Sequence, residues 1–195
     1  MLHRTVKAMH SRNKGDTIIE VILAVTVFSL VAVGAMTIMS SGISRAQRTL
    51  EITQVRHQID AQAEMLRYIR DRSSEDGDYA TLWGDITSTS RVVANPVSVL
   101  NADSCPDASD LGSSSMFSLR PASGGTVGIW GSDRYKHEPD TYAKVTDTES
   151  QGISIQVTEA EGGGAYDAYV QACWYGPGSS RPATIGTIVR LYATN

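Results

Sequence analysis

One apolar run dominates the amino-terminal part of the chain. From Val21 to Ser44 there is no charged residue in 24 positions, and the apolar stretch from Ile18 to Met39 is long enough to cross a bilayer as a helix, which needs about 20 residues. The stretch is rich in β-branched residues, but in lipid the backbone must satisfy its own hydrogen bonds, which favours a helix over a strand. The pattern therefore predicts a membrane helix, with residues 17–43 in the membrane.

The helix is expected to continue beyond the apolar run. From Arg45 to Arg72 the chain has no glycine and no proline, and apolar residues recur at spacings of three and four, which is typical of one face of a helix. The residues of this apolar stripe are Ile52, Val55, Ile59, Leu66 and Ile69, with Gln62 in the remaining place. The small and acidic run RSSEDGD then ends the pattern. We expect one continuous helix from Thr17 to Arg72, whose second half packs against a domain.

Residues 73–195 alternate between apolar and polar side chains in several short segments, as antiparallel strands do. The alternation is clear in GISIQVTEA, DAYVQACWYG and TIGTIVRLYA, and weaker in GTVGIWG and in RVVANPVSVL, which Pro96 interrupts. The stretches NADSCPDASDLGSSS and EGGGAYD are typical of exposed loops. The sequence thus predicts an α+β fold, in which the long helix packs on an antiparallel sheet of about four or five strands.

Charge is distributed unevenly along the chain. Residues 1–15 hold four basic residues and no acidic residue, which is typical of the cytoplasmic flank of a membrane segment. The remaining residues carry 13 basic and 21 acidic side chains, a net charge of about −8. Because binding to phosphates favours net positive charge, we do not expect nucleic acid as the main partner, although a local basic patch stays open.

The chain has two cysteines, Cys105 and Cys173. If the part after the membrane segment faces outward, an oxidising compartment allows these residues to form a disulfide, which would close a loop of about 68 residues. Two unrelated buried thiols are the alternative, and sequence alone does not give the distance between them.

A processing signal precedes the apolar run. A secretory signal peptide has its cleavage site after the apolar core, whereas here a basic leader ends in KGDTIIEV, before the core. This junction resembles the leader of type IV prepilins and of type II secretion pseudopilins. The matching residues are Lys14, Gly15, Thr17, Ile18, Ile19 and Glu20. The resemblance is strong over residues 12–45, architectural over 46–72 and only topological beyond. The sequence departs from the family in having Asp16 where phenylalanine is usual, and Thr37 where many members have a proline.

The resemblance implies a type IV pilin-like fold and a maturation route. A prepilin peptidase would cut after Gly15 and methylate the new amino terminus at Asp16. The chain would then comprise a leader (1–15), a hydrophobic helix (16–44), its amphipathic continuation (45–72) and a β-rich globular domain (73–195). Before assembly it would cross the cytoplasmic membrane once, with the globular domain outside, and afterwards it would belong to an extracellular pilus. The implied partners are the prepilin peptidase, the platform protein of pilus assembly and other pilin subunits.

Glu20 is the unusual residue of the apolar region, because a carboxylate within a membrane segment is costly. The family offers a reason for it. After cleavage the chain would begin with a charged amine at Asp16, and the Glu20 carboxylate of one subunit would neutralise the amine of a neighbour. A subunit that enters the filament out of step would leave both charges unpaired, so we expect Glu20 and Asp16 to set the register of assembly.

The remaining residues do not favour an enzyme or a metal centre. There is no Gly-x-Ser-x-Gly or Cys-x-x-Cys motif, and the four histidines lack metal-ligand spacing. We expect no catalytic residues, no cofactor and no metal site. Asp103, Asp107 and Asp110 fall in one loop, which we interpret as a solvated turn rather than as a calcium-binding loop. Five aromatic residues fit part-buried core positions better than an adhesive surface. They are Trp130, Tyr135, Tyr142, Tyr166 and Tyr175.

Three functions therefore follow from the sequence. The preferred one is a structural subunit of a type IV pilus-like surface filament, major or minor. The second is a type II secretion pseudopilin, and the third is a single-span, membrane-anchored binding module that does not polymerise.

Overall fold

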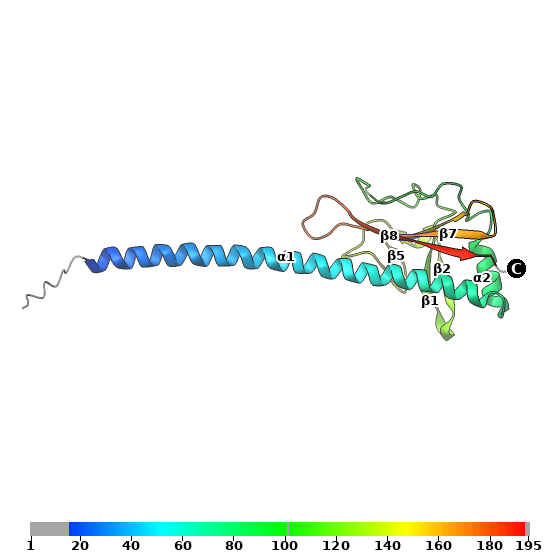
Figure 1. The fold of residues 1–195 in the computed structure, drawn as a ribbon, viewed down its shortest axis with the longest axis horizontal. Coiled ribbons are helices and arrows are strands. Elements are labelled where there is room, and N and C mark those ends of the chain that lie inside the picture. The colour runs from blue at the N-terminus through cyan, green and yellow to red at the C-terminus, as the bar shows by residue number, and fades with distance from the viewer. Residues whose placement is uncertain (1–15, 101, 194–195) are drawn as a thin grey trace, which may run out of the picture. The chain divides into compact units, whose positions relative to one another are not determined.

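A single long helix opens the structure. The computed structural model describes residues 16–100 and 102–193 of the chain, which divides into two compact units, Met1–Ala46 and Gln47–Asn195. Helix α1 (Asp16–Arg72) runs through the boundary between them without a break, as the continuous ribbon in Figure 1 shows. The predicted long amino-terminal helix is therefore confirmed, including its end at Arg72.

The second unit combines a short helix with short strands. The elements that follow α1 are α2 (Gly77–Ile86), β1 (Ser118–Pro121), the 3-10 turn η1 (Ser123–Gly125), β2 (Val127–Trp130), the 3-10 turn η2 (Ser132–Arg134), β3 (Tyr135–Lys136), β4 (Lys144–Val145), β5 (Ser150–Gln151), β6 (Ile153–Glu159), β7 (Ala165–Trp174) and β8 (Ala183–Tyr192). This set of elements confirms the broad α+β class.

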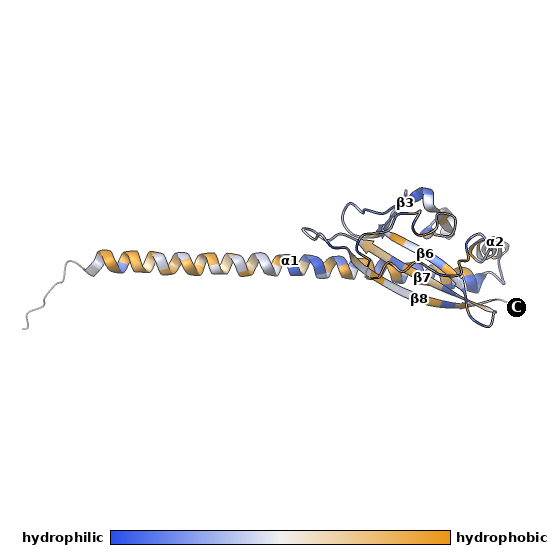
Figure 2. Cartoon of the chain, turned by 90° about the horizontal axis from the view of Figure 1, so that it is seen from above, coloured by the Kyte–Doolittle hydropathy of each residue, from blue (hydrophilic) through white to orange (hydrophobic). Residues whose placement is uncertain are grey.

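The largest sheet contains the three segments in which the sequence alternates most clearly. It is antiparallel, in the order β6-β7-β8, and Figure 2 shows the three strands side by side. The register places Val170, in the middle of β7, opposite Ile155 on β6 and Thr187 on β8. The strand predictions for these segments are confirmed.

The expected single sheet of four or five strands is not what the structure has. β1 pairs with β2 in a separate antiparallel hairpin, and β3, β5 and β4 form a small sheet in which β3 runs parallel to β5. The weak candidate GTVGIWG does contain β2. Strands of two to four residues offer too few alternating positions for a sequence pattern to reveal them or their partners.

The amphipathic half of α1 packs on the main sheet through its predicted stripe. Val55, Ile59, Leu66 and Ile69 are no more than 2% exposed and share one apolar cluster with the sheet. The strands contribute Ile153, Ile155, Val157, Ala168, Val170, Ala172, Trp174, Val189 and Leu191 to that cluster. Since burial of one such aliphatic side chain is worth about 1.5–3 kcal/mol, this contact is the main support of the second unit.

Gln62 occupies the polar place in the stripe because it completes the edge of a strand. Its side chain is 1% exposed. The amide Nε2 donates to the carbonyl of Leu119 at 2.7 Å, and Oε1 accepts from the backbone N–H of Leu119 at 2.7 Å. One side chain of α1 thus bonds β1 as the backbone of a neighbouring strand would. Without it, two buried backbone groups would lack partners.

Two further glutamines of α1 bind the same side of the unit. Gln58 accepts a hydrogen bond from the backbone N–H of Val145 at 3.3 Å, and Gln54 accepts one from the hydroxyl of Tyr142 at 3.3 Å. Residues four apart on a helix lie on one face, so Gln54, Gln58 and Gln62 form a row of amides that fastens β1 and β4 to the helix.

Helix α2 was not predicted from the sequence. Asp76 caps it by accepting a hydrogen bond from the backbone N–H of Asp78, and Tyr79, Trp83 and Ile86 are buried beneath it. The run RSSEDGD therefore both ends α1 and begins α2. The sequence does carry a signal for α2, which is a capping aspartate followed by Tyr79, Trp83 and Ile86 at spacings of four and three. The helix has only ten residues, so this pattern is short.

The weak candidate RVVANPVSVL is not a strand. Val92 forms an isolated bridge with β6, and beyond it the backbone is bound by side-chain amides. Gln171 accepts from the N–H of Val99 at 2.8 Å and donates to the carbonyl of Val97 at 2.9 Å, while Gln156 accepts from the N–H of Val97 at 2.8 Å. Outward-facing glutamines of the sheet thus replace a strand partner.

These bonds hold a covering segment, residues 92–100 and 102–116, over the face of the sheet that points away from α1. Strand β6 is consequently buried on both faces along all but its last residue, Glu159. The loop expected to be exposed within this segment is also anchored, since Cys105, Leu111 and Ser115 are buried. Alternation of polar and apolar residues is typical of a sheet with one solvated face, but the glutamines of this face bind the covering backbone.

Replacement of Gln62 by methionine should destabilise the second unit by about 2–4 kcal/mol, because the N–H and carbonyl of Leu119 would stay buried without partners. Chemical unfolding of the detergent-solubilised chain, followed by near-ultraviolet circular dichroism, measures the change. Gln54→Met is the matched control, since its contact is exposed, and it should cost less than about 1 kcal/mol. Equal losses in the two variants would contradict the role given to Gln62.

Candidate functional site

The candidate site is the apolar part of α1, from Ile18 to Met39, whose side chains are not covered by other parts of the chain. Every described side chain from Thr17 to Leu50 is exposed, except that of Ala32, which is half-buried. Phe28, Leu30 and Ile38 are between 73% and 76% exposed. Figure 2 shows hydrophobic residues all round this part of the helix. A helix that is apolar on every side is stable only in an apolar surrounding.

This helix is long and apolar enough to cross a membrane. Among the residues the structure describes, it is the one helix with that property, and none of its most apolar stretch is buried within the protein. A core helix of a soluble protein would be buried, so the apolar surface needs lipid or other helices to cover it.

The hydroxyl groups within the apolar part are satisfied by the helix itself. Ser29 and Thr37 donate to the carbonyls four residues earlier, at 2.7 and 2.9 Å, and Thr26 donates to the carbonyl of Leu23 at 2.8 Å. These side chains therefore do not require water. The helix is also regular through Gly34 and Gly42.

Glu20 is the exception in this segment. Its side chain is exposed, and no described residue forms a hydrogen bond or an ion pair with it. Asp16 is the first residue of α1 and lies one turn before Glu20, so both residues fall on one face of the helix. The proposed cleavage residue Gly15 and the leader, residues 1–15, lie outside the described residues, as does the side chain of Asp16.

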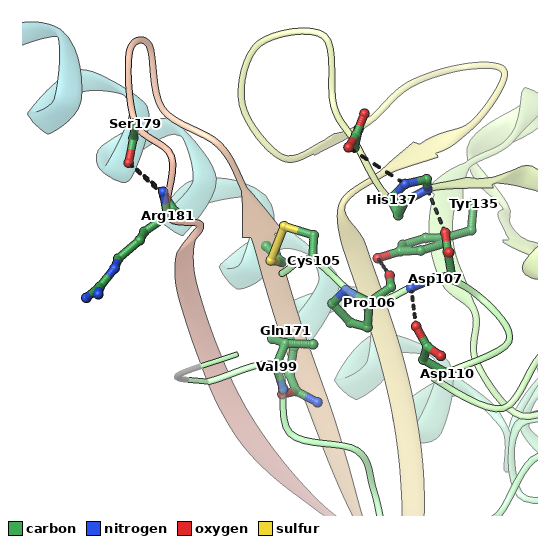
Figure 3. Close-up of a disulfide and its surroundings, with 12 residues drawn as sticks. Val99, Cys105, Pro106, Asp107, Asp110, Tyr135, His137, Gln171, Ser179 and Arg181 are labelled. Atoms are coloured by element: carbon green, nitrogen blue, oxygen red, sulfur yellow. Dashed lines mark hydrogen bonds and ion pairs between the residues drawn. A yellow bond between two sulfur atoms is a disulfide. The ribbon is translucent and has the colours of Figure 1, made fainter. Parts of the chain in front are cut away.

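Cys105 and Cys173 form a disulfide, which resolves the question that the sequence left open. Their Cα atoms are 5.5 Å apart, and Figure 3 shows the bridge between the covering segment and β7. The bridge lies in a second apolar cluster with Val99, Leu111 and Met116. It fixes the covering segment on the outer face of the sheet.

Polar contacts hold the two residues that follow Cys105, as Figure 3 also shows. The hydroxyl of Tyr135 donates to the carbonyl of Pro106 at 3.2 Å, and His137 Nδ1 lies 2.7 Å from a carboxylate oxygen of Asp107. Burial, together with the negative charge of Asp107, raises the pKa of Tyr135 well above its ordinary value. The phenol therefore stays protonated and keeps donating to Pro106.

Two of the three acidic residues in the loop have partners within the protein. Asp110 accepts a hydrogen bond from the backbone N–H of Asp107 at 3.0 Å, and Asp107 faces His137. No group of three or more His, Cys, Asp or Glu residues within the described ranges is placed to hold a metal ion.

The five aromatic residues singled out from the sequence are all half-buried. Tyr142 and Tyr166 pack against the main apolar cluster, and Tyr135 and Tyr175 pack against the cluster around the disulfide. Trp130 instead lies beneath the guanidinium of Arg120, 4.2 Å from the ring centroid. Four of the five thus support packing rather than an adhesive surface.

A comparison of the chain with protein-family models, with curated proteins and with solved structures gave no significant match.

Removal of the disulfide should lower the free energy of unfolding by about 4 kcal/mol, because a cross-link across a loop of this length restricts the unfolded chain. The double variant Cys105→Ala, Cys173→Ala measured by chemical unfolding in detergent tests this. Intact mass after thiol labelling is the control and should find no free thiol in the unreduced native chain. Two labelled thiols would contradict the pairing.

Proposed function

We propose that this chain is a structural subunit of a type IV pilus-like surface filament. It is made as a single-span membrane precursor, trimmed after Gly15, and polymerised through the apolar part of α1. The partners of this proposal are a prepilin peptidase, the platform protein of an assembly machine and further pilin subunits.

The observation that carries the proposal is the contrast between the two halves of α1. One half is buried against the main sheet through Val55, Ile59 and Leu66, and the other is exposed on all sides although it is almost wholly apolar. A subunit of a helical filament needs both features, because the packed half attaches the domain and the apolar half becomes the shared core. Lipid would cover the apolar half before assembly.

Glu20 is what favours polymerisation over a plain membrane anchor. An anchor gains nothing from an ionised group near the start of its span, and such groups are rare unless they serve a function. In a filament the carboxylate would meet the free amine of a neighbouring Asp16, and the charged pair would be tolerated where a lone charge is not. The pairing would also restrict neighbours to one axial register.

The apolar helix alone also fits the third function, a membrane-anchored module that does not polymerise. That function requires neither cleavage after Gly15 nor a role for Glu20. A type II secretion pseudopilin would share both features with a pilin, and electron microscopy of labelled surface filaments separates the two, because a pseudopilus stays within the envelope.

Replacement of Glu20 by glutamine should leave membrane insertion intact but reduce incorporation into filaments roughly 100-fold. The estimate follows from the several kcal/mol that an unpaired buried amine costs. Quantitative blotting of sheared surface filaments and of membranes from the same cells measures both quantities.

Asp60→Asn is the matched control for this variant, since Asp60 is an exposed carboxylate of the same helix, outside the apolar part. It should assemble normally. Filaments of normal abundance from the Glu20→Gln strain would refute the role of Glu20 while leaving the membrane topology unaffected.

A further inference from the structure

Strand β8 is an open edge of the main sheet, whereas the opposite edge is closed. Beyond β6, the bridges of Val92 with Val157 and of Phe117 with Ile155 continue the hydrogen bonding of the sheet. No described strand pairs with β8 on its outer side, where Figure 2 shows it as the last strand. Alternate residues of β8, a strand of ten residues, therefore offer backbone groups to a further strand.

The hydrogen bonds identify which residues of β8 face outward. On β7, the carbonyl of Ala165 points toward β6 and accepts a hydrogen bond from the backbone N–H of Ala160. Tyr192 of β8 is paired with Ala165, so the backbone N–H and carbonyl of Tyr192 point away from β7. Arg70 confirms this direction, since its Nε donates to the carbonyl of Tyr192 at 2.8 Å. Because the direction alternates along an antiparallel strand, four further residues face outward. They are Thr184, Gly186, Ile188 and Arg190.

This edge lacks the usual protection against strand pairing. Edge strands are commonly blocked by proline or by charged side chains, especially lysine, and β8 contains no proline, no lysine and one charged residue. Its one charged residue, Arg190, is held by Asp167 through two hydrogen bonds of 2.8 Å. Ile188 and Tyr192 are 58% and 60% exposed.

A groove lies beside the open edge, on the face of the sheet that carries the side chains of Tyr169 and Ile188. It encloses about 510 Å³, and its lining includes Pro96, Leu100, Tyr169, Gly186 and Ile188. Gly186 forms part of the floor, where a side chain would come within 3.6 Å of Leu100. An added strand would place the residue opposite Gly186 on this same face, because directly opposed residues of paired strands share a face.

We propose that the β8 edge binds an extended segment of another protein chain, with a large apolar or aromatic side chain opposite Gly186. The free backbone groups of Thr184, Gly186 and Ile188 provide the affinity, and the groove selects the side chain. A large side chain across from a strand glycine fills the space that the glycine leaves. This surface belongs to the second unit and does not depend on whether α1 polymerises.

A second copy of β8 is the alternative occupant of the edge, because an antiparallel register can set its Ile188 opposite Gly186. Adducts between two β8 strands would reveal that occupant.

A photo-crosslinking residue at Thr184 tests the proposal in the full chain, expressed in its native cells. We expect adducts with an extended, apolar segment of a different protein, identified by mass spectrometry of the linked peptides. Ile188→Lys should reduce the adducts at least tenfold, because a charge at the edge opposes strand pairing, whereas Thr148→Lys, at an exposed site away from β8, should not. Adducts within the same chain only, adducts between two β8 strands, or adducts that survive Ile188→Lys would overturn the proposal.

Residue-resolved hydrogen exchange gives an independent measurement on the unsubstituted chain. In the detergent-isolated protein the outward amides of Gly186 and Ile188 should exchange quickly, while those of Thr187 and Val189, which bond to β7, stay protected. In native membranes or filaments the exchange rates of these two outward amides should fall at least tenfold. Equal exchange of Gly186 and Ile188 in both states would contradict an added strand, and normal protection of Thr187 in Ile188→Lys shows that this variant keeps its fold.

Discussion

The structure depends on the need of one helix for two different surroundings. Helix α1 satisfies its own backbone hydrogen bonds over its whole length, but its side chains make opposite demands. The stripe residues Val55, Ile59, Leu66 and Ile69 are covered by the main sheet, whereas the apolar residues from Ile18 to Ile43 have no cover in the chain. Such an apolar surface is unstable in water. Lipid and the helices of other subunits are both adequate covers, and a protein that moves from one to the other would exchange two similar apolar surroundings.

Amide side chains hold β1 to this helix and the covering segment to the main sheet. Gln62 binds β1 from the helix side, and Gln156 and Gln171 bind the covering segment from the sheet side. Each replaces a missing strand, so irregular segments can lie over a sheet without leaving buried backbone groups unsatisfied. The disulfide between Cys105 and Cys173 then limits how far the covering segment can separate from the sheet. The second unit is thus stabilised by a helix–sheet core on one face and by amides and a cross-link on the other.

Sequence reasoning succeeded where a pattern repeats over many residues. The stripe from Val55 to Ile69 and the alternation in β6, β7 and β8 each offer enough positions to be recognised. It failed where the deciding contacts join distant residues. Nothing near Gln171 in the sequence indicates that it binds Val97 and Val99, which lie more than 70 residues earlier in the chain. Pairing of Cys105 with Cys173 stayed undecided for the same reason. Of the candidate site, the sequence located the apolar helix and Glu20, while the open edge of β8 emerged only from the hydrogen bonds.

The central proposal is that the apolar part of α1 becomes the core of an assembly once a free amine exists at Asp16. Intact mass and amino-terminal peptide mapping of the protein from its native cells test it most directly. The account predicts a chain that begins at Asp16, recovered in particles that contain more than one subunit. A chain that still carries residues 1–15 and is recovered only as monomers from the membrane would contradict it.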